Sequence, residues 1–192
     1  MTLPLDRRPV IVALAGPNGA GKTTFYYSHL QEAGLRFIEP DRLAAELELD
    51  PYEAARLADA LREQLFRQGE SFVFETVFSG PEEGKLGFLS RAAEAGCNVV
   101  LCFVGIAGPE ISDQRVAMRV SQGGHDVPRS KLLSRFPRTL ANLKAALRRL
   151  PHVWVFDNTD LTRPFRRVAV FQNGRPEKLS GSIPPWLRPL LP

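Results

Sequence analysis

An uninterrupted apolar run, Val10–Ala15, leads directly into a loop of glycines and small residues that ends in a lysine and a threonine. The loop, Gly16–Thr23, reads Gly-Pro-Asn-Gly-Ala-Gly-Lys-Thr and matches the pattern G-x-x-x-x-G-K-[ST] in full. The apolar run has the length of a buried strand, and a helix is expected from about Gly21. A strand–loop–helix unit of this kind constrains the rest of the chain to build a sheet beside the first strand.

A loop of this composition is suited to wrapping a polyphosphate with backbone N–H groups. Gly16, Gly19 and Gly21 permit the close approach and the bends, and the following helix presents unpaired N–H groups to the anion. In this motif the lysine, Lys22, bridges the terminal phosphates, and the hydroxyl of Thr23 ligates Mg²⁺. We therefore expect ATP or GTP with Mg²⁺ here; the alternative is a glycine-rich turn without a ligand. The predicted nucleotide-binding residues are Gly16, Pro17, Asn18, Gly19, Ala20, Gly21, Lys22, Thr23 and Thr24.

Strand-sized apolar runs alternate with longer amphipathic segments, which is the pattern of a parallel sheet covered by helices. We predict an α/β fold of the P-loop NTPase type, a three-layer sandwich with helices on both faces of the sheet and a helical lid. The sheet is expected to be mostly parallel with five to six strands, and residues 1–192 are expected to form one domain. Strands are predicted at 10–15, 36–38, 72–75, 98–104, 153–156 and 166–171, with helices from about 21 and at 43–49, 51–68, 82–95, 110–121 and 129–150.

A carboxylate, Asp41, follows the second predicted strand in the segment Glu39-Pro40-Asp41. Ligands of an open parallel sheet bind at the carboxyl ends of its strands, so this side chain is expected to point toward the glycine loop. A kinase needs a base or an orienting group on the acceptor hydroxyl, and Asp41 is the candidate for that role. The alternative is that Asp41 caps a helix beginning at Arg42–Leu43, a position that aspartate favours.

Glu75 ends the third predicted strand, Phe72–Glu75. An acid after a hydrophobic strand beside such a loop is placed to hold Mg²⁺, directly or through water. We predict Thr23 and Glu75 as metal ligands, and Glu75 and Thr76 as residues of the acceptor cleft. The alternative for Glu75 is a salt bridge of a helix or a loop.

Two arginine-rich helices joined by a glycine-rich loop, residues 123–128, are predicted to form a mobile lid over residues 109–150. Arg115 and Arg119 are four residues apart, so one helix face offers both guanidinium groups. Closure of the lid would set arginines against the charge that develops on the transferring phosphoryl group. The alternative for each arginine is an exposed position on an amphipathic helix.

The second of these helices carries Arg135 and Arg138, three residues apart, on either side of Pro137. The proline is expected to kink or divide the helix. In the loop between the helices, His125 is expected to make a structural hydrogen bond rather than to act as a base.

Charge and hydropathy limit the partners. The net charge of +4 is modest, and arginines scattered along helices are usually solvated, so we do not expect nucleic acid to bind. No apolar run reaches the roughly 18 residues that a membrane span needs, and Met1–Arg8 has no apolar signal core. A cytoplasmic protein without a membrane partner is therefore expected. Cys97 and Cys102 are an odd number of residues apart on a predicted strand, so they are expected to be buried thiols on opposite faces. The Pro-rich tail, residues 183–192, is expected to be irregular.

Four signals, in this order, resemble the zeta-toxin and sugar-kinase branch of the P-loop kinases. The glycine loop is shared by many superfamilies. The segments Glu-Thr-x-Phe-Ser-Gly and Arg-x-x-x-Gly-Gly-His-x-Val-Pro are much more specific to zeta-toxin-like proteins. The four signals are Gly16–Thr23, Pro40-Asp41, Phe74–Gly80 and Arg119–Pro128, and together they span the chain from about Val10 to Asn158.

The resemblance implies phosphoryl transfer from ATP to a hydroxyl of a sugar or nucleotide sugar, with UDP-N-acetylglucosamine as the best-known acceptor of the family. It implies that Asp41 is the catalytic base, that Lys22 and Arg119 stabilise the phosphates, and that Arg135 is a candidate for a second such arginine. By the same resemblance Glu75 lies in the acceptor or metal site, and a protein antitoxin is a candidate partner.

Two other functions share most of these residues. A nucleoside or nucleic-acid-end kinase has the same catalytic parts and differs in its acceptor groove. A regulatory ATPase or nucleotide switch has no acceptor. The Asn-Lys-x-Asp segment with which GTPases read the base is absent, and residues 157–160 do not replace it. The arginines of the predicted lid favour transfer to an acceptor over a switch.

Overall fold

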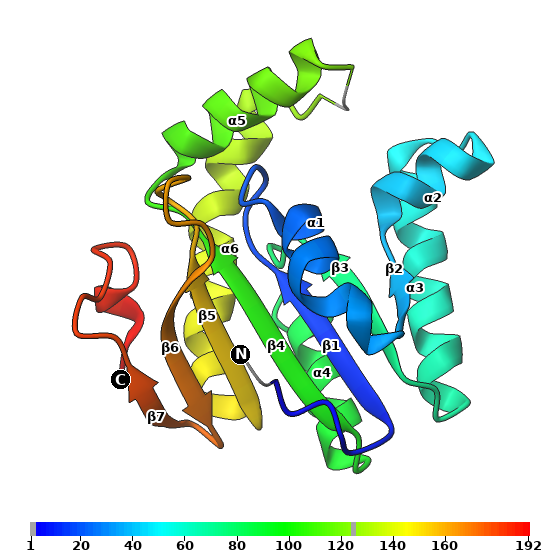
Figure 1. Ribbon diagram of the computed structural model, residues 1–192. Coiled ribbons are helices and arrows are strands. Elements are labelled where there is room, and N and C mark those ends of the chain that lie inside the picture. The colour runs from blue at the N-terminus through cyan, green and yellow to red at the C-terminus, as the bar shows by residue number, and fades with distance from the viewer. Residues whose placement is uncertain (1–2, 124–125) are drawn as a thin grey trace.

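The strands of the described residues join one seven-stranded sheet in the order β2-β3-β1-β4-β5-β6-β7 (Figure 1). This computed structural model describes residues 3–123 and 126–192. Strands β2, β3, β1, β4 and β5 run parallel, and β6 and β7 extend the sheet antiparallel. The strands are β1 (Val10–Ala15), β2 (Arg36–Ile38), β3 (Phe72–Thr76), β4 (Asn98–Gly105), β5 (His152–Asp157), β6 (Arg166–Gln172) and β7 (Arg175–Leu179).

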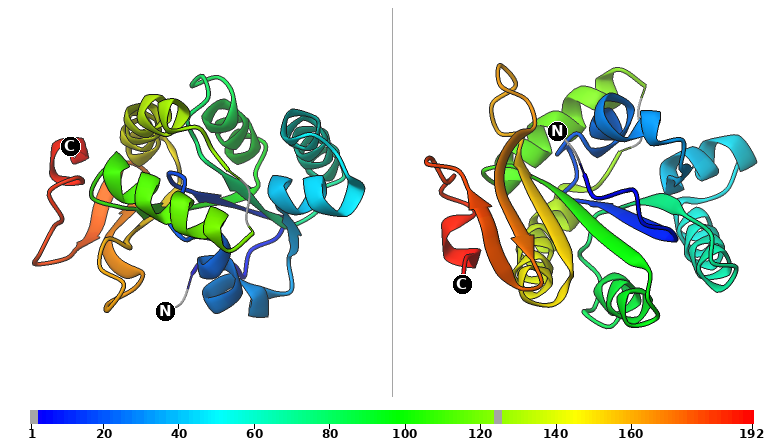
Figure 2. Two further views of the ribbon diagram at one scale, coloured as in Figure 1. Left: turned by 90° about the horizontal axis from the view of Figure 1, so that it is seen from above. Right: turned by 60° about the horizontal axis from the view of Figure 1, so that its bottom comes forward.

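Helices cover both faces of the sheet, which Figure 2 shows between two helical layers. Helices α3, α4 and α6 bury apolar side chains against one face, and α1 with the turn that follows it covers the other. The predicted three-layer α/β architecture is therefore confirmed. The helices are α1 (Lys22–Phe25), α2 (Pro40–Leu47), α3 (Pro51–Arg67), α4 (Lys85–Glu94), α5 (Pro109–Ser121) and α6 (Arg129–Arg149), with a π-helical turn (Tyr26–Leu30) and 3₁₀ turns (Gln31–Ala33 and Arg188–Leu190).

The sheet has one strand more than the upper limit predicted from the sequence. The added strand, β7, has the sequence Arg-Pro-Glu-Lys-Leu and is exposed along its whole length, so it carries no apolar alternation. It forms as the hairpin partner of β6 across Asn173-Gly174, where both residues have positive φ angles, 49° and 78°. Such a pair matches the twist of a two-residue hairpin turn.

Helix α2 begins at Pro40, three residues earlier than predicted. Proline suits the first turn of a helix because its φ angle is already helical and its missing N–H is not needed there. The next helix, α3, is capped by Asp50, whose carboxylate accepts hydrogen bonds from the backbone N–H of Tyr52 (2.8 Å) and of Glu53 (3.2 Å). Helix α6 runs through Pro137 without being divided.

The C-terminal tail is more ordered than the prediction of an irregular segment. Trp186 and Leu187 are buried, and a 3₁₀ turn follows them. The indole nitrogen of Trp186 donates a hydrogen bond to Asp157 Oδ1 (3.0 Å), at the carboxyl end of β5. The indole lies so close to Gly105 that a Cβ atom there would overlap the ring.

The two cysteines pack against the apolar clusters on opposite faces of the sheet, as predicted, but Cys97 is only partly buried. Cys102 is fully buried, and burial raises the pKa of its thiol to about 12, so it serves as a small apolar side chain. Across the described ranges, none of the helices has the length and apolarity needed to cross a membrane.

The arrangement of β1 and β3 creates the place for a ligand. These neighbouring parallel strands send their following helices, α1 and α4, to opposite faces of the sheet. A crevice at the carboxyl ends of the two strands results. Helix α5 lies over this edge of the sheet (Figure 1).

Candidate active site

The glycine loop lies tightly against the end of β4. Gly16 has a φ angle of 149°, and a Cβ atom at this position would overlap the carbonyl oxygen of Val104. Gly19 and Gly21 also have positive φ angles, 71° and 87°. A side chain at any of these three positions would strain the backbone, so the glycines fix the shape of the loop.

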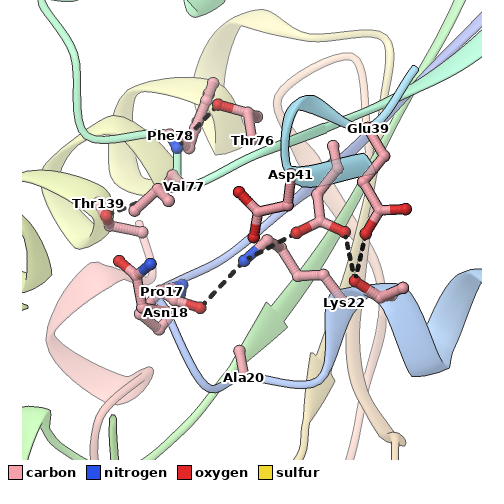
Figure 3. Close-up of polar contacts among 12 residues, drawn as sticks. Pro17, Asn18, Ala20, Lys22, Glu39, Asp41, Thr76, Val77, Phe78 and Thr139 are labelled. Carbon is pink, nitrogen blue, oxygen red and sulfur yellow. Dashed lines mark hydrogen bonds and ion pairs between the residues drawn. The ribbon is translucent and has the colours of Figure 1, made fainter. Parts of the chain in front are cut away.

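Lys22, the first residue of α1, is only 6% exposed. Its Nζ atom donates a hydrogen bond across the loop to the carbonyl oxygen of Pro17 (3.2 Å; Figure 3) and lies 3.5 Å from Glu75 Oε1. The ammonium group is thus held over the concave side of the loop. A phosphate bound there would meet a cation that is already positioned.

The hydroxyl of Thr23 lies between two carboxylates. Its Oγ1 atom is 2.9 Å from Glu39 Oε1 and 3.0 Å from Glu75 Oε2. A hydroxyl has one proton, so it cannot donate to both carboxylates at once. Burial raises the pKa of Glu39, and the negative charge of Glu75 raises it further, while the hydrogen bond from Thr23 opposes the shift.

This oxygen-rich set fits a hard divalent cation. Mg²⁺ is typically held by one or two carboxylates together with substrate phosphates and water. Glu39 was not predicted as part of the set. Nowhere in the described part of the chain do three or more His, Cys, Asp or Glu side chains gather as metal ligands would, so the set offers two carboxylates and one hydroxyl.

Asp41 and Arg119 meet although they come from α2 and α5. Arg119 Nη1 lies 3.7 Å from Asp41 Oδ2, and the two side chains are 42% and 61% exposed. The capping alternative for Asp41 is wrong, because α2 begins at Pro40 and places Asp41 inside its first turn, with Glu39 at the N-cap position. Asp41 therefore does not serve as the N-cap of a helix.

A cavity of about 640 Å³ opens beside the loop and gathers most of the predicted site. It extends from the glycine loop, past β3, to a wall formed by α3 and the beginning of α4. The predicted site residues that line it are Asn18, Gly19, Lys22, Asp41, Glu75, Thr76, Arg119 and Arg135.

The segment after β3 forms a fixed wall of this cavity. Thr76 Oγ1 accepts a hydrogen bond from the backbone N–H of Phe78 (3.0 Å), whose φ angle is 62°. From α6, Thr139 donates to the carbonyl oxygen of Val77 (2.9 Å), and Asn142 donates to that of Phe78 (2.9 Å). Figure 3 shows the first two of these contacts. Contact of Thr76 with an acceptor stays a prediction.

The arginines of the predicted lid have different surroundings. Arg115 donates to the carbonyl oxygens of Gly19 (3.3 Å) and Thr159 (3.0 Å), so it ties α5 to the glycine loop. Burial lowers the pKa of Arg115, although the charge of Asp157 opposes the shift. Arg138 is exposed and donates to a carbonyl of its own helix. Residues 124 and 125 lie outside the described residues, so the predictions for His125 and for that part of the loop are not tested.

The predicted lid is longer than the part of the chain that overhangs the cavity. Leu143, Ala146 and Leu147 of α6 are buried in the cluster that covers the sheet. The second half of α6 therefore belongs to the core and is not available to move as a lid. Movement of α5 stays a prediction.

Comparison with known proteins agrees with this geometry. The model of the zeta toxin family matches residues 48–174, about two thirds of the chain. The chain belongs to the zeta toxin family. The matched range of this zeta toxin family member contains Glu75, Arg119 and Arg135, whereas the glycine loop and Asp41 precede it. An uncharacterized protein of Haemophilus influenzae is 32% identical over 115 residues, which are 57% of this chain and 80% of that protein.

Solved structures share the fold of this family member. The AvrRxo1-ORF1:ORF2 complex with ATP superimposes with a TM-score of 0.72 at 20% sequence identity, over 91% of this chain and 61% of that chain. A structure from the PezAT toxin–antitoxin system of Streptococcus pneumoniae gives a TM-score of 0.62 at 16% identity, over 86% of this chain and 72% of that chain. At these identities the likeness shows the fold alone. The chain spans about three fifths of the AvrRxo1 chain that it matches.

Proposed function

We propose that this zeta toxin family member is an ATP-dependent phosphotransferase. Its acceptor is a hydroxyl of a sugar or of a nucleotide sugar such as UDP-N-acetylglucosamine. The observation that carries the proposal is the Asp41–Arg119 pair on the cavity that Lys22 and Glu75 also line. A nucleotide-binding loop alone fits many functions, whereas a carboxylate and an arginine facing it across a cavity fit transfer to an acceptor.

The nucleotide phosphates would be wrapped by the backbone of residues 16–24, with Lys22 on the terminal phosphates. Thr23, Glu39 and Glu75 would hold Mg²⁺, since they present the hard oxygen ligands that this ion prefers. Mg²⁺ bound there supplies positive charge that neutralises the phosphate oxygens during transfer.

On the acceptor side, Asp41 orients the attacking hydroxyl and takes its proton as the new oxygen–phosphorus bond forms and the bond from the γ-phosphorus to the bridging oxygen breaks, so that ADP leaves. Its contact with Arg119 is 3.7 Å long and solvent-exposed, so an acceptor can displace it at small cost. Arg119 then faces the negative charge on the transferring group, and Arg135, which also lines the cavity, is the candidate for a second cation.

Family membership also suggests a partner. The PezAT structure is described as part of a toxin–antitoxin system, and the AvrRxo1 structure contains ORF1 with ORF2. We therefore propose a protein antitoxin as the partner that restrains this enzyme.

The test is incubation with ATP, Mg²⁺ and a panel of nucleotide sugars, free sugars, nucleosides and an oligonucleotide. Mass spectrometry then identifies the acceptor that gains one phosphoryl group. Arg119→Met should lower the turnover number much more than it weakens ATP binding, because its charge acts mainly in the transition state. Arg138→Met, which removes an exposed arginine that does not line the cavity, is the matched control. Phosphate release to water alone would favour the regulatory ATPase, and phosphorylation of the oligonucleotide alone would favour the nucleic-acid-end kinase.

A further inference from the structure

The wall of the cavity formed by α3 and the beginning of α4 carries a cluster of charges that the proposed chemistry does not use. We call Asp59, Arg62 and Lys85 the distal wall. Arg62 is only 6% exposed, and its guanidinium lies over the rings of Phe74 (5.1 Å to the centroid) and Phe88 (4.6 Å). All three residues of the distal wall line the cavity.

Asp59 is shared between the two cations. Arg62 Nη1 donates to Asp59 Oδ1 at 2.7 Å, and Lys85 Nζ contacts the same oxygen. One carboxylate thus faces two positive charges, and one charge stays uncompensated within the cluster. The Nε atom of Arg62 is buried and has no hydrogen-bond partner among the described residues. Charge on a buried group such as Arg62 is costly unless another group pairs with it, and Lys85, which is 25% exposed, can still reach a bound ligand.

Positive and negative side chains are unevenly distributed along the cavity. The end beside the glycine loop has three carboxylates, those of Glu39, Asp41 and Glu75, for the two cations Lys22 and Arg119. Lys131 of α6 adds one cation to the lining and the exposed Asp126 adds one carboxylate, whereas Arg135 is the cation already assigned to the transferring group. These residues leave the distal wall with its excess of positive charge.

The titration of Lys85 is consistent with this shortage of negative charge. Burial lowers the pKa of its ammonium group and the charge of Arg62 lowers it further, whereas the hydrogen bond to Asp59 and the negative charges of Asp59 and Glu63 oppose both effects. An anion placed against Lys85 would restore the balance.

We propose that the distal wall is a subsite for an anionic oxygen group, a phosphate or a carboxylate, that the acceptor carries away from its reacting hydroxyl. This inference rests on the proposed function, because it concerns the acceptor of that reaction. Lys85 binds the anion directly with a flexible, multiply donating ammonium group. Arg62 is the positioning residue, since its rigid stacking on two phenylalanine rings fixes Asp59, and Asp59 in turn holds Lys85.

The competing explanation is that the cluster only fastens α4 to α3. The structure offers a matched control for this explanation. Arg91 of α4 lies 2.8 Å from Glu63 of α3, so it joins the same two helices, but neither residue lines the cavity. A purely structural clamp predicts the same consequences for loss of Lys85 and of Arg91.

The experiment compares acceptors in matched pairs that differ in one anionic group. The pairs are uridine with uridine monophosphate, N-acetylglucosamine with its 1-phosphate, and glucose with glucuronate, so that phosphate and carboxylate are scored separately. Wild-type enzyme should favour the anionic member of at least one pair in kcat/KM. Lys85→Met should reduce that preference about 10- to 100-fold, the size expected for a hydrogen bond between charged groups. Lys85→Arg should keep most of it, and Arg91→Met should leave it unchanged.

A second measurement separates this inference from the proposed function. The same probes are titrated calorimetrically into wild-type and variant protein saturated with a non-hydrolysable ATP analogue and Mg²⁺. Lys85-dependent binding of anionic probes without transfer would support the subsite and count against the kinase. Transfer with no preference for the anionic member of any pair would overturn the subsite and leave the kinase standing. The subsite is also overturned if no anionic probe binds, or if Lys85→Met and Arg91→Met behave alike.

Discussion

The surroundings of Asp41 allow its contributions to stability and to catalysis to be separated. Asp41 pairs with Arg119 at 3.7 Å, and the two side chains are 61% and 42% exposed. Exposed pairs of this kind contribute about 0–1 kcal/mol. Its place in the first turn of α2 adds about 0.3–1 kcal/mol through the helix dipole. Replacement by asparagine should therefore cost about 1 kcal/mol of unfolding free energy, which in a chain of this length lowers Tm by about 2–4 °C.

The expected effect on phosphoryl transfer is much larger. Asparagine keeps the shape of the side chain but cannot take a proton from the acceptor hydroxyl. Loss of a general base lowers the rate about 10²- to 10⁴-fold, so Asp41→Asn should be nearly inactive while its affinity for ATP with Mg²⁺ is retained. The assay measures acceptor phosphorylation at saturating ATP, the dissociation constant for ATP, and Tm on the same preparations.

A control from the same helix tests whether position or chemistry matters. Glu46 is a 55% exposed carboxylate of α2 that pairs with Arg42 at 2.7 Å and does not line the cavity. Glu46→Gln should cost no more stability than Asp41→Asn, because Glu46 lies in the last turn of α2 where the helix dipole does not favour a carboxylate, and it should retain full activity. The reasoning is refuted if Asp41→Asn transfers phosphate at the wild-type rate, or if Glu46→Gln loses as much activity.

Three further predictions concern the loop, the carboxylate pair and the tail. Lys22→Ala should lower ATP turnover at least about 100-fold while circular dichroism shows an intact fold, because it removes the cation that the loop holds in place; turnover at the wild-type rate would show that this loop is not the phosphate site. Glu39 has a raised pKa, so the folded protein keeps this proton to higher pH than the unfolded chain does, and stability should fall as the pH rises from about 4.5 through the folded-state pKa. Without metal, Glu39→Gln should therefore have a higher Tm than wild type at neutral pH but not at acidic pH. Added Mg²⁺ should raise the Tm of wild type more than that of the variant. An equal rise in both proteins would exclude Glu39 from the metal site. Gly105→Ala should lower the unfolding free energy by about 1–3 kcal/mol, since its methyl group overlaps the indole of Trp186; denaturant titration followed by tryptophan fluorescence measures the loss, and an unchanged midpoint would show that the tail does not pack there.

The local sequence pattern was sufficient to predict a helix or strand wherever that element buries its own apolar residues. Strand β4 is buried at every position, and its apolar run is visible in the sequence with nearly correct bounds. Strand β7 is exposed at every position, so its formation depends on pairing with β6 rather than on its own composition. Helix α2 begins at Pro40 rather than at the predicted residue 43, because proline is favourable in the first turn of a helix.

The site divides in the same way between local and long-range information. Lys22 and Thr23 follow from one motif, and Glu75 follows from its place at the end of an apolar strand. Predicting Glu39 as a residue of the site would have required the register of the sheet. Ile38 is aligned with Phe74 in the parallel pair of β2 and β3, so the next residues along, Glu39 and Glu75, emerge side by side at the carboxyl edge. The local sequence of β2 and of β3 does not determine that these strands are neighbours. The contacts of the distal wall likewise join α3 and α4, and neither helix sequence alone predicts them.

The base of α5 shows how the glycine loop and the acceptor side are mechanically connected. Ser112 is buried and donates from its hydroxyl to the carbonyl oxygen of Asn18 (2.6 Å), and Arg115 holds that of Gly19 (3.3 Å). Arg119 lies one helical turn farther along and reaches Asp41. We expect a rearrangement of the loop around phosphates to reach Arg119 along this short helical segment. Because both contacts tie the base of α5 to the glycine loop, we expect a closing movement either to bend α5 beyond Arg115 or to carry the loop with it.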